Sequence, residues 1–198
     1  MRDLECPFCN MENERIIYES GNFFVTPTLG SFLEGYLLIC TNRHFIGLSQ
    51  IPEELFQELD ELKEKVKKAL SDVYTSPIFF EHGVIDETKR GGCCVDHAHL
   101  HAVPIDFDIF PDIVRNFEAR RIERILELRK QQEKGRPYFY YENQKGDKYV
   151  FELSGPVPPQ YLRQIVAVRA GLGMRWDWRE SPEFENFNKT LEKLRRRF

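Results

Sequence analysis

An alternating run of histidines constrains this sequence more than any other feature. Residues 94–104 read CVDHAHLHAVP, and three of the five histidines in the chain, His97, His99 and His101, lie two residues apart within it. Successive side chains of a β-strand point to opposite faces, so these imidazoles would share one face while the residues between them pack on a core. A solvent-facing strand would carry mixed Ser, Thr, Lys or Glu, whereas imidazole nitrogens need partners. The run therefore predicts a strand with a chemical function.

A second cluster, of metal-ligand type, lies near the N-terminus. Residues 6–9 read CPFC, and such a C-x2-C turn brings two thiols to one point as half of a zinc site. The other two ligands would come from His44, His82 or one histidine of the run. A redox dithiol uses the same spacing, but it usually precedes a helix in a βαβ unit, which is missing here.

The order of predicted elements indicates an α+β protein. Spacing of apolar residues predicts helices over about 52–72 and over 112–134, and two shorter helices, one ending near Gly171 and one running from Pro182 to the C-terminus. The strand candidates are residues 15–28 (a hairpin), 35–41, 77–83, 95–104 and the two halves of a second hairpin around residues 143–147. Because hairpins dominate, we expect a largely antiparallel sheet. We place one domain at residues 1–108 and a C-terminal α/β extension, packed on it, at residues 109–198.

Composition excludes several classes of protein. The 198 residues are 41% hydrophobic and 30% charged, which is typical of a folded globular chain. The net charge of −4 argues against a whole-protein electrostatic grip on nucleic acid. No apolar run approaches the roughly 20 residues that span a bilayer, and the N-terminus has no apolar signal core. Five cysteines, an odd number, fit a reducing compartment better than a disulfide framework, so a cytoplasmic protein is expected.

Taken together, these motifs resemble the HIT (histidine triad) superfamily, which includes nucleotide hydrolases and nucleotidyltransferases. The family pattern alternates three histidines with apolar residues, and residues 97–103, HAHLHAV, match it in full. The CPFC turn, a hairpin, the strand GYLLICT followed by Asn42-Arg43-His44, and a helix after a proline precede the triad in the family order. The resemblance covers about residues 5–105 and implies a HIT-like antiparallel sheet with helices.

The resemblance implies a role for each matching residue. His99, the central histidine, would be the nucleophile, and His101 would orient the phosphate or hold a neighbouring ring. Cys94 stands where many members carry a serine that assists the leaving group. By the same resemblance, the ligands of a structural zinc ion, which would fix the triad strand, are Cys6, Cys9, His44 and His97.

Further residues are expected to contact the substrate. Arg43 and the backbone around Gly92 would supply donors to a phosphate, and Glu81 stands where many members have asparagine. The C-terminal segment is similar, more weakly, to that of splicing-associated Cwf19-like proteins. This second resemblance adds Gln160 and Arg163 to the expected substrate-binding residues.

The resemblance and the chemistry of histidine together predict a nucleotide hydrolase or nucleotidyltransferase. A largely neutral imidazole can attack an α-phosphate and form a nucleotidyl-histidine, which water or another acceptor then resolves. One alternative is a zinc hydrolase in which His97 and His99 both bind a catalytic metal. Another is a zinc-stabilised binding module for RNA or a protein, with its basic residues between 115 and 124 and the tail KLRRRF as contacts. Many relatives of this kind are homodimers, so a homodimer is also possible.

Overall fold

The computed structural model describes residues 5–86, 88 and 95–198. Within them, eight strands form one sheet in the order β1-β2-β3-β5-β4-β7-β8-β6, and every neighbouring pair is antiparallel. The strands are β1 (Tyr18–Glu19), β2 (Phe23–Pro27), β3 (Leu37–Thr41), β4 (Pro77–Gly83), β5 (His99–Pro104), β6 (Ala119–Ile122), β7 (Tyr138–Glu142) and β8 (Lys148–Glu152). The expected α+β class and antiparallel sheet are confirmed.

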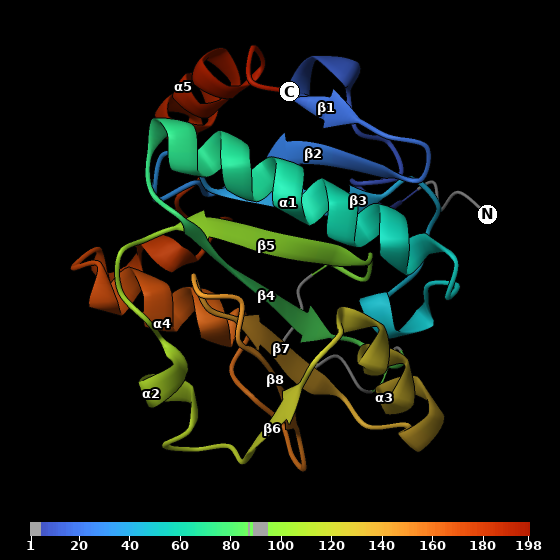
Figure 1. Ribbon diagram of the computed structural model, residues 1–198. Helices are drawn as coiled ribbons and strands as arrows, with labels where there is room; N and C mark the ends of the chain where they lie inside the picture. Colours follow the sequence, from blue (N-terminus) through green and yellow to red (C-terminus); the bar gives the residue numbers. More distant parts are fainter. Residues whose placement is uncertain (1–4, 87, 89–94) are drawn as a thin grey trace.

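Helices cover both faces of this sheet. The helices are α1 (Leu55–Val73), α2 (Phe110–Ile113), α3 (Arg129–Lys134), α4 (Tyr161–Arg169) and α5 (Phe184–Leu194), with short 3₁₀ helices η1 (Asn13–Arg15), η2 (Leu48–Gln50), η3 (Ile125–Leu128) and η4 (Gly173–Trp176). Helix α1 crosses one face in front of β2, β3 and β5 (Figure 1). None of the helices in the described ranges is long and apolar enough to cross a bilayer.

Helix α1 shows why the sequence folds as it does on this face. Its buried residues Phe56, Leu59, Leu62, Val66 and Leu70 recur every three or four positions, which gives one apolar stripe. That stripe and the side chains on the α1 face of the sheet form one hydrophobic core cluster. The predicted helix over residues 52–72 is confirmed to within three residues at its start.

Alternation along the strands separates two core clusters. Leu100 and Ala102 of β5 belong to the cluster under α1. On the opposite face, Leu162 and Val166 of α4 join a second cluster that includes Phe80. Because side chains alternate, His99 and His101 lie on the α4 face of the sheet.

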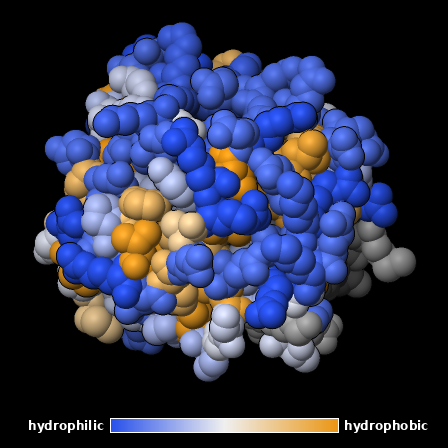
Figure 2. All heavy atoms as spheres, turned by 60° about the horizontal axis from the view of Figure 1, so that its bottom comes forward, coloured by the Kyte–Doolittle hydropathy of each residue, from blue (hydrophilic) through white to orange (hydrophobic). Residues whose placement is uncertain are grey.

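The C-terminal extension continues the sheet. Strand β7 pairs with β4 from Phe79↔Glu142 to Gly83↔Tyr138, and β8 and β6 follow. The sheet therefore runs without a break from the strands before residue 108, the expected domain boundary, to those after it. Most of the molecular face shown in Figure 2 is hydrophilic, with apolar side chains gathered left of its centre.

The prediction of one helix over residues 112–134 is wrong. This segment contains the end of α2, the outer strand β6, η3 and α3. Ile113 belongs to the cluster on the α4 face, whereas Ile125 and Leu128 belong to the cluster under α1. One straight helix could not bury residues on both faces of a sheet, so tertiary packing overrides the helical spacing.

Candidate functional site

The first part of the site is a group of four metal-ligand side chains. Cys6, Cys9, His44 and His97 offer ligand atoms that all lie within 4.8 Å of one another. The Sγ atom of Cys6 is 3.3 Å from Nδ1 of His97, and Sγ of Cys9 is 3.3 Å from Nδ1 of His44 and 3.7 Å from Nδ1 of His97. Zinc–sulfur bonds of about 2.3 Å and zinc–nitrogen bonds of about 2.0 Å place tetrahedral ligands about 3.5 Å apart. The cluster therefore has the dimensions of a tetrahedral metal site.

The protonation of His97 also fits metal binding. Its Nε2 lies 2.8 Å from the carbonyl oxygen of Thr41, which can only accept, so Nε2 carries the hydrogen and Nδ1 is free to bind a metal. Burial lowers the pKa of His97 to about 4 and raises the pKa of the Cys6 thiol to about 11. A divalent cation would reverse the second effect by stabilising the thiolate. His82 is not part of the cluster.

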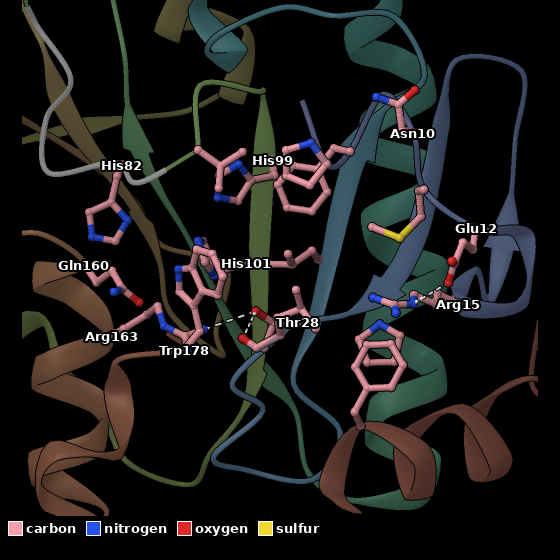
Figure 3. Close-up of a pocket in the computed structure, with 18 residues that line it drawn as sticks. Asn10, Glu12, Arg15, Thr28, His82, His99, His101, Gln160, Arg163 and Trp178 are labelled. Carbon is pink, nitrogen blue, oxygen red and sulfur yellow. Dashed lines mark hydrogen bonds and ion pairs between the residues drawn. The ribbon is translucent and has the colours of Figure 1, made fainter. Parts of the chain in front are cut away.

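The second part of the site is a cavity of about 310 Å³ on the α4 face of the sheet. His99 and His101 line it, together with His82 from β4 and with Gln160 and Arg163 from the extension. Figure 3 shows His82, Gln160, Arg163 and Trp178 on one side of His99 and His101, and Asn10, Glu12 and Arg15 on the other. Residues that line the cavity thus lie on both sides of the two triad histidines. Apolar residues of the N-terminal segment and of α5, among them Phe8, Met11, Leu29 and Phe187, also line it.

His99 is held in one tautomer. Its Nδ1 lies 2.5 Å from the carbonyl oxygen of His97, and since that oxygen only accepts, Nδ1 carries the hydrogen. The Nε2 atom of the neutral ring then keeps its lone pair. Burial lowers the pKa of His99, and the nearby charge of Arg163 lowers it further against the opposing hydrogen bond to His97.

His101 supports its neighbour from within the sheet. It is 4% exposed, its Nδ1 lies 2.8 Å from the hydroxyl of Tyr36, and its ring stacks on Phe80 at 4.5 Å between centroids. Burial keeps the pKa of His101 well below its usual value, with the charges of His99, His82 and Arg163 acting in the same direction. Its ring centroid is 4.9 Å from that of His99. His101 is therefore a neutral, fixed neighbour of His99.

The sequence reasoning missed His82 as a cavity residue, because it was considered only as a metal ligand. Its Nε2 accepts the backbone N–H of Leu162 in the first turn of α4 at 3.1 Å. Burial lowers the pKa of His82 to about 3, with like charge from His99 and Arg163 as smaller causes. Alternation along β4 places His82 on the same face as Phe80, but only the pairing of Phe80 with His101 in the neighbouring strand shows that this face meets the triad.

The extension closes over the cavity at Gly30. This glycine has a φ of +61°, and a Cβ on it would lie 2.4 Å from Cβ of Trp178. Its N–H donates to the carbonyl of Pro182, and its own carbonyl accepts from Arg163 at 2.7 Å. Only glycine allows this close approach, which seats the segment containing Trp178 on the N-terminal half of the chain.

Two expected substrate contacts lie away from the cavity. Arg43 is exposed, and its guanidinium stacks over the ring of Phe45. Glu81 points to the α1 face, where its carboxylate accepts from the N–H of Leu48 at 2.7 Å and from the hydroxyl of Tyr138 at 2.6 Å. Alternation along β4 explains this, because Phe80 and His82 occupy the cavity face. We therefore leave both residues out of the proposed substrate contacts.

Two other expected residues cannot be placed. Cys94 and Gly92 lie outside the residues that the structure describes. The zinc-hydrolase interpretation is not supported by the geometry, because His97 joins the metal cluster whereas His99 bonds to the carbonyl of His97 and lines the cavity.

The chain is similar to several known proteins. It is 22% identical over 207 residues to CWF19-like protein 1 of Xenopus laevis, a match that covers 94% of this chain but only 37% of that protein. A zinc-bound histidine triad family protein from Mycobacterium smegmatis is 21% identical, with a TM-score of 0.43, over 66% of this chain and 95% of the other. Yeast Ap4A phosphorylase in complex with Ap4A is 13% identical, with a TM-score of 0.48, over 73% of this chain and 62% of the other.

Both TM-scores lie below 0.5, so the family assignment rests on a family model. The model of the HIT domain matches residues 10–108, which is half of the chain and contains the whole histidine triad. The chain therefore belongs to the HIT domain family.

Proposed function

We propose that this chain is a nucleotide hydrolase or nucleotidyltransferase that forms a nucleotidyl intermediate on Nε2 of His99. The observation that carries the proposal is the 2.5 Å hydrogen bond from Nδ1 of His99 to the carbonyl of His97, in a ring that lines the cavity. This bond leaves the lone pair on Nε2. It would also stabilise the positive charge that the ring gains when Nε2 bonds to phosphorus.

The reaction has two displacements at one phosphorus atom. The lone pair of Nε2 attacks the α-phosphorus, an N–P bond forms, and the P–O bond to the leaving group breaks with its electron pair on the leaving oxygen. An oxygen of water or of another acceptor then attacks the same phosphorus. The N–P bond breaks, its electron pair returns to Nε2, and the acceptor releases its proton to solvent. Splitting one difficult displacement into two easier ones is the advantage of a covalent intermediate.

Arg163 supports a phosphate in this cavity. Its side chain lies in the interior, at 3% exposure, and its N–H groups donate to Thr28 Oγ1, the carbonyl of Gly30 and the carbonyl of Trp176. All three acceptors are uncharged, and within the described part of the chain no carboxylate forms an ion pair with this guanidinium. An anion in the cavity would compensate the buried charge, and this is the electrostatic role that we assign to a substrate phosphate.

We further propose that the metal held by Cys6, Cys9, His44 and His97 is zinc and that it is structural. Two sulfur and two nitrogen ligands are the set that closed zinc sites use, and they leave no position for a substrate. The bound metal would tie the N-terminal segment to His97, two residues before β5. His97 itself then fixes the carbonyl to which His99 donates.

Quenching in alkaline denaturant after mixing with α-phosphate-labelled mono- and dinucleotides tests the enzymatic proposal. We expect label on His99, in a bond that acid breaks and base does not. His99→Asn should abolish labelling, and Arg43→Ala, which alters an exposed residue outside the cavity, should label like the wild type. Absence of label from every nucleotide in the panel would contradict catalysis. Salt-sensitive RNA binding that survives His99→Ala would then favour the binding module.

A further inference from the structure

An unpartnered buried oxygen lies at the edge of the cavity. Gln160 is 4% exposed, and its Oε1 has no hydrogen-bond partner among the residues that the structure describes. Its Nε2 lies 3.3 Å from Oδ1 of Asp177. Because a carboxylate only accepts, this contact fixes which end of the amide faces Asp177. In Figure 3 the oxygen of Gln160 is directed to the side on which His101 and His99 lie.

Such an oxygen is costly unless a ligand satisfies it. A buried acceptor without a donor destabilises the folded state, because the group has lost its hydrogen bonds to water and gained none in return. The backbone of Gln160 is also strained, since its φ of +56° lies in the left-handed region that favours glycine. Buried unsatisfied groups and strained non-glycine residues gather at ligand sites. Both features coincide in a residue that lines the cavity.

The neighbourhood of Gln160 limits the kind of donor. Arg163 lies one turn further along α4 and carries the uncompensated charge that we assign to a phosphate. In a nucleotide, the donors next to a phosphate are the hydroxyl groups of the sugar, whereas the base amino groups lie further away. The donor that meets Gln160 is therefore a sugar hydroxyl.

We propose that Oε1 of Gln160 accepts a hydrogen bond from a sugar hydroxyl of the substrate, next to the phosphate held against Arg163. Gln160 would then be a specificity-determining residue supplied by the C-terminal extension. This inference rests on the nucleotide site of the proposed function. The hydroxyl has two possible sources: the ribose of the transferred nucleotide, or a hydroxylated leaving group on the other side of the α-phosphorus.

Equilibrium binding to the His99→Asn protein separates recognition from turnover. Titration calorimetry would compare adenosine 5′-monophosphate with its 2′-deoxy and 3′-deoxy forms, and adenosine 5′-diphosphate glucose with adenosine 5′-diphosphate. Each ligand is measured with and without the Gln160→Met substitution. Methionine has a volume similar to that of glutamine and needs the same backbone conformation, but it lacks the acceptor oxygen. Gln164→Met is the matched control, because Gln164 is partly exposed on the same helix and donates to the carbonyl of Pro159.

We expect Gln160→Met to lower the affinity for every ligand that carries the recognised hydroxyl about tenfold or more, and to leave the affinity for the matching ligand without that hydroxyl unchanged. If the monophosphate, the diphosphate and the diphosphate glucose all lose affinity while the 2′-deoxy or the 3′-deoxy form does not, the donor is a ribose hydroxyl. A loss confined to adenosine 5′-diphosphate glucose identifies the leaving group. An equal loss for all ligands, or no loss, overturns the role of Gln160 while wild-type labelling of His99 leaves the proposed function standing. Absence of both binding and labelling overturns both. Melting temperatures within a few degrees of the parent establish that each variant is folded.

Discussion

His97 and His99 are joined by a hydrogen bond between Nδ1 of His99 and the carbonyl oxygen of His97, at 2.5 Å. The side chain of His97 belongs to the metal cluster, and the side chain of His99 lines the cavity. One short segment of backbone thus couples a structural site to a reactive one. Loss of the metal should therefore affect both the stability of the fold and the reactivity of His99.

Removing two of the metal ligands tests this coupling. We expect Cys6→Ala combined with Cys9→Ala to lose a zinc ion that the wild type holds at one per chain. The free energy of unfolding should fall by about 4 kcal/mol or more, because the N-terminal segment loses its attachment to the triad. Labelling of His99 should fall as well. Elemental analysis, urea unfolding and the labelling assay measure the three effects.

Cys40→Ala is the matched control for this experiment. Cys40 is a fully buried cysteine of β3 that is not part of the metal cluster. Its replacement should cost about 1 kcal/mol of packing and leave the zinc content unchanged. Equal zinc in the double variant and the wild type would contradict the assigned ligands.

Arg163 should determine anion affinity. Arg163→Met removes the buried charge, so the affinity for a nucleoside monophosphate should fall roughly a hundredfold. Arg163→Lys keeps the charge but not the three-way hydrogen bonding of the guanidinium, so an intermediate affinity is expected. Arg169 lies on the same helix as Arg163, and Arg169→Met, which breaks only a partly exposed ion pair with Asp112 of α2, should bind like the wild type. Calorimetry of folded variants measures all three, and unchanged binding by Arg163→Met would refute the charge role.

The buried pair Lys63–Glu142 should be important for stability. Lys63 Nζ lies 2.6 Å from Glu142 Oε2, and both side chains are almost fully buried. Lys63→Met leaves a buried carboxylate without its cation and should cost about 3–5 kcal/mol. The double variant with Glu142→Gln should recover part of this loss. Urea unfolding of the two single variants and the double variant measures the coupling, and strictly additive losses would contradict it.

Glu81 should make stability depend on pH. Burial raises the pKa of Glu81 to about 7, although hydrogen bonds from Leu48 and Tyr138 act to lower it. In the unfolded chain, glutamate has a pKa of about 4.3. The folded state therefore holds this proton more tightly. The stabilisation that it gives is complete below the unfolded pKa and is lost as pH rises through the folded pKa.

Glu81→Gln cannot titrate and should lack this dependence. Relative to the wild type, the variant should gain about 2 kcal/mol in unfolding free energy between pH 5 and pH 8. Urea unfolding of both proteins at the two pH values measures the difference. If that difference is the same at both values, Glu81 does not titrate as described.

The metal-cluster residues and the triad strand were predictable because each depends on local spacing or on the family pattern. The CPFC turn and the alternation of histidines with apolar residues are visible over a few residues of sequence. The structure brings Cys6 and Cys9 together with His44 and His97. The helix over residues 52–72 was predictable because it carries a regular apolar stripe.

The remaining features depend on contacts between distant segments. Ala119–Ile122 becomes a strand because β8 pairs with it. The residues around it keep a helical spacing of apolar positions, so the local sequence does not reveal the strand. His82 joins the cavity because β4 lies beside β5. The placements of Arg43 and Glu81 depended on knowing which face of a strand or loop meets the cavity, and the sequence left that open.

The pairing of β7 with β4 has a consequence for self-association. Strand β4 is hydrogen-bonded to β5 along one edge and to β7 along the other, so neither edge can accept a strand from a second copy. A sheet shared between two copies would have to run through the outermost strands, Tyr18–Glu19 or Ala119–Ile122, which offer two and four residues of backbone. The extension thus makes β4 an interior strand of the sheet. We expect any close dimer of this chain to form through the helix-covered faces of the sheet and not through paired strand edges.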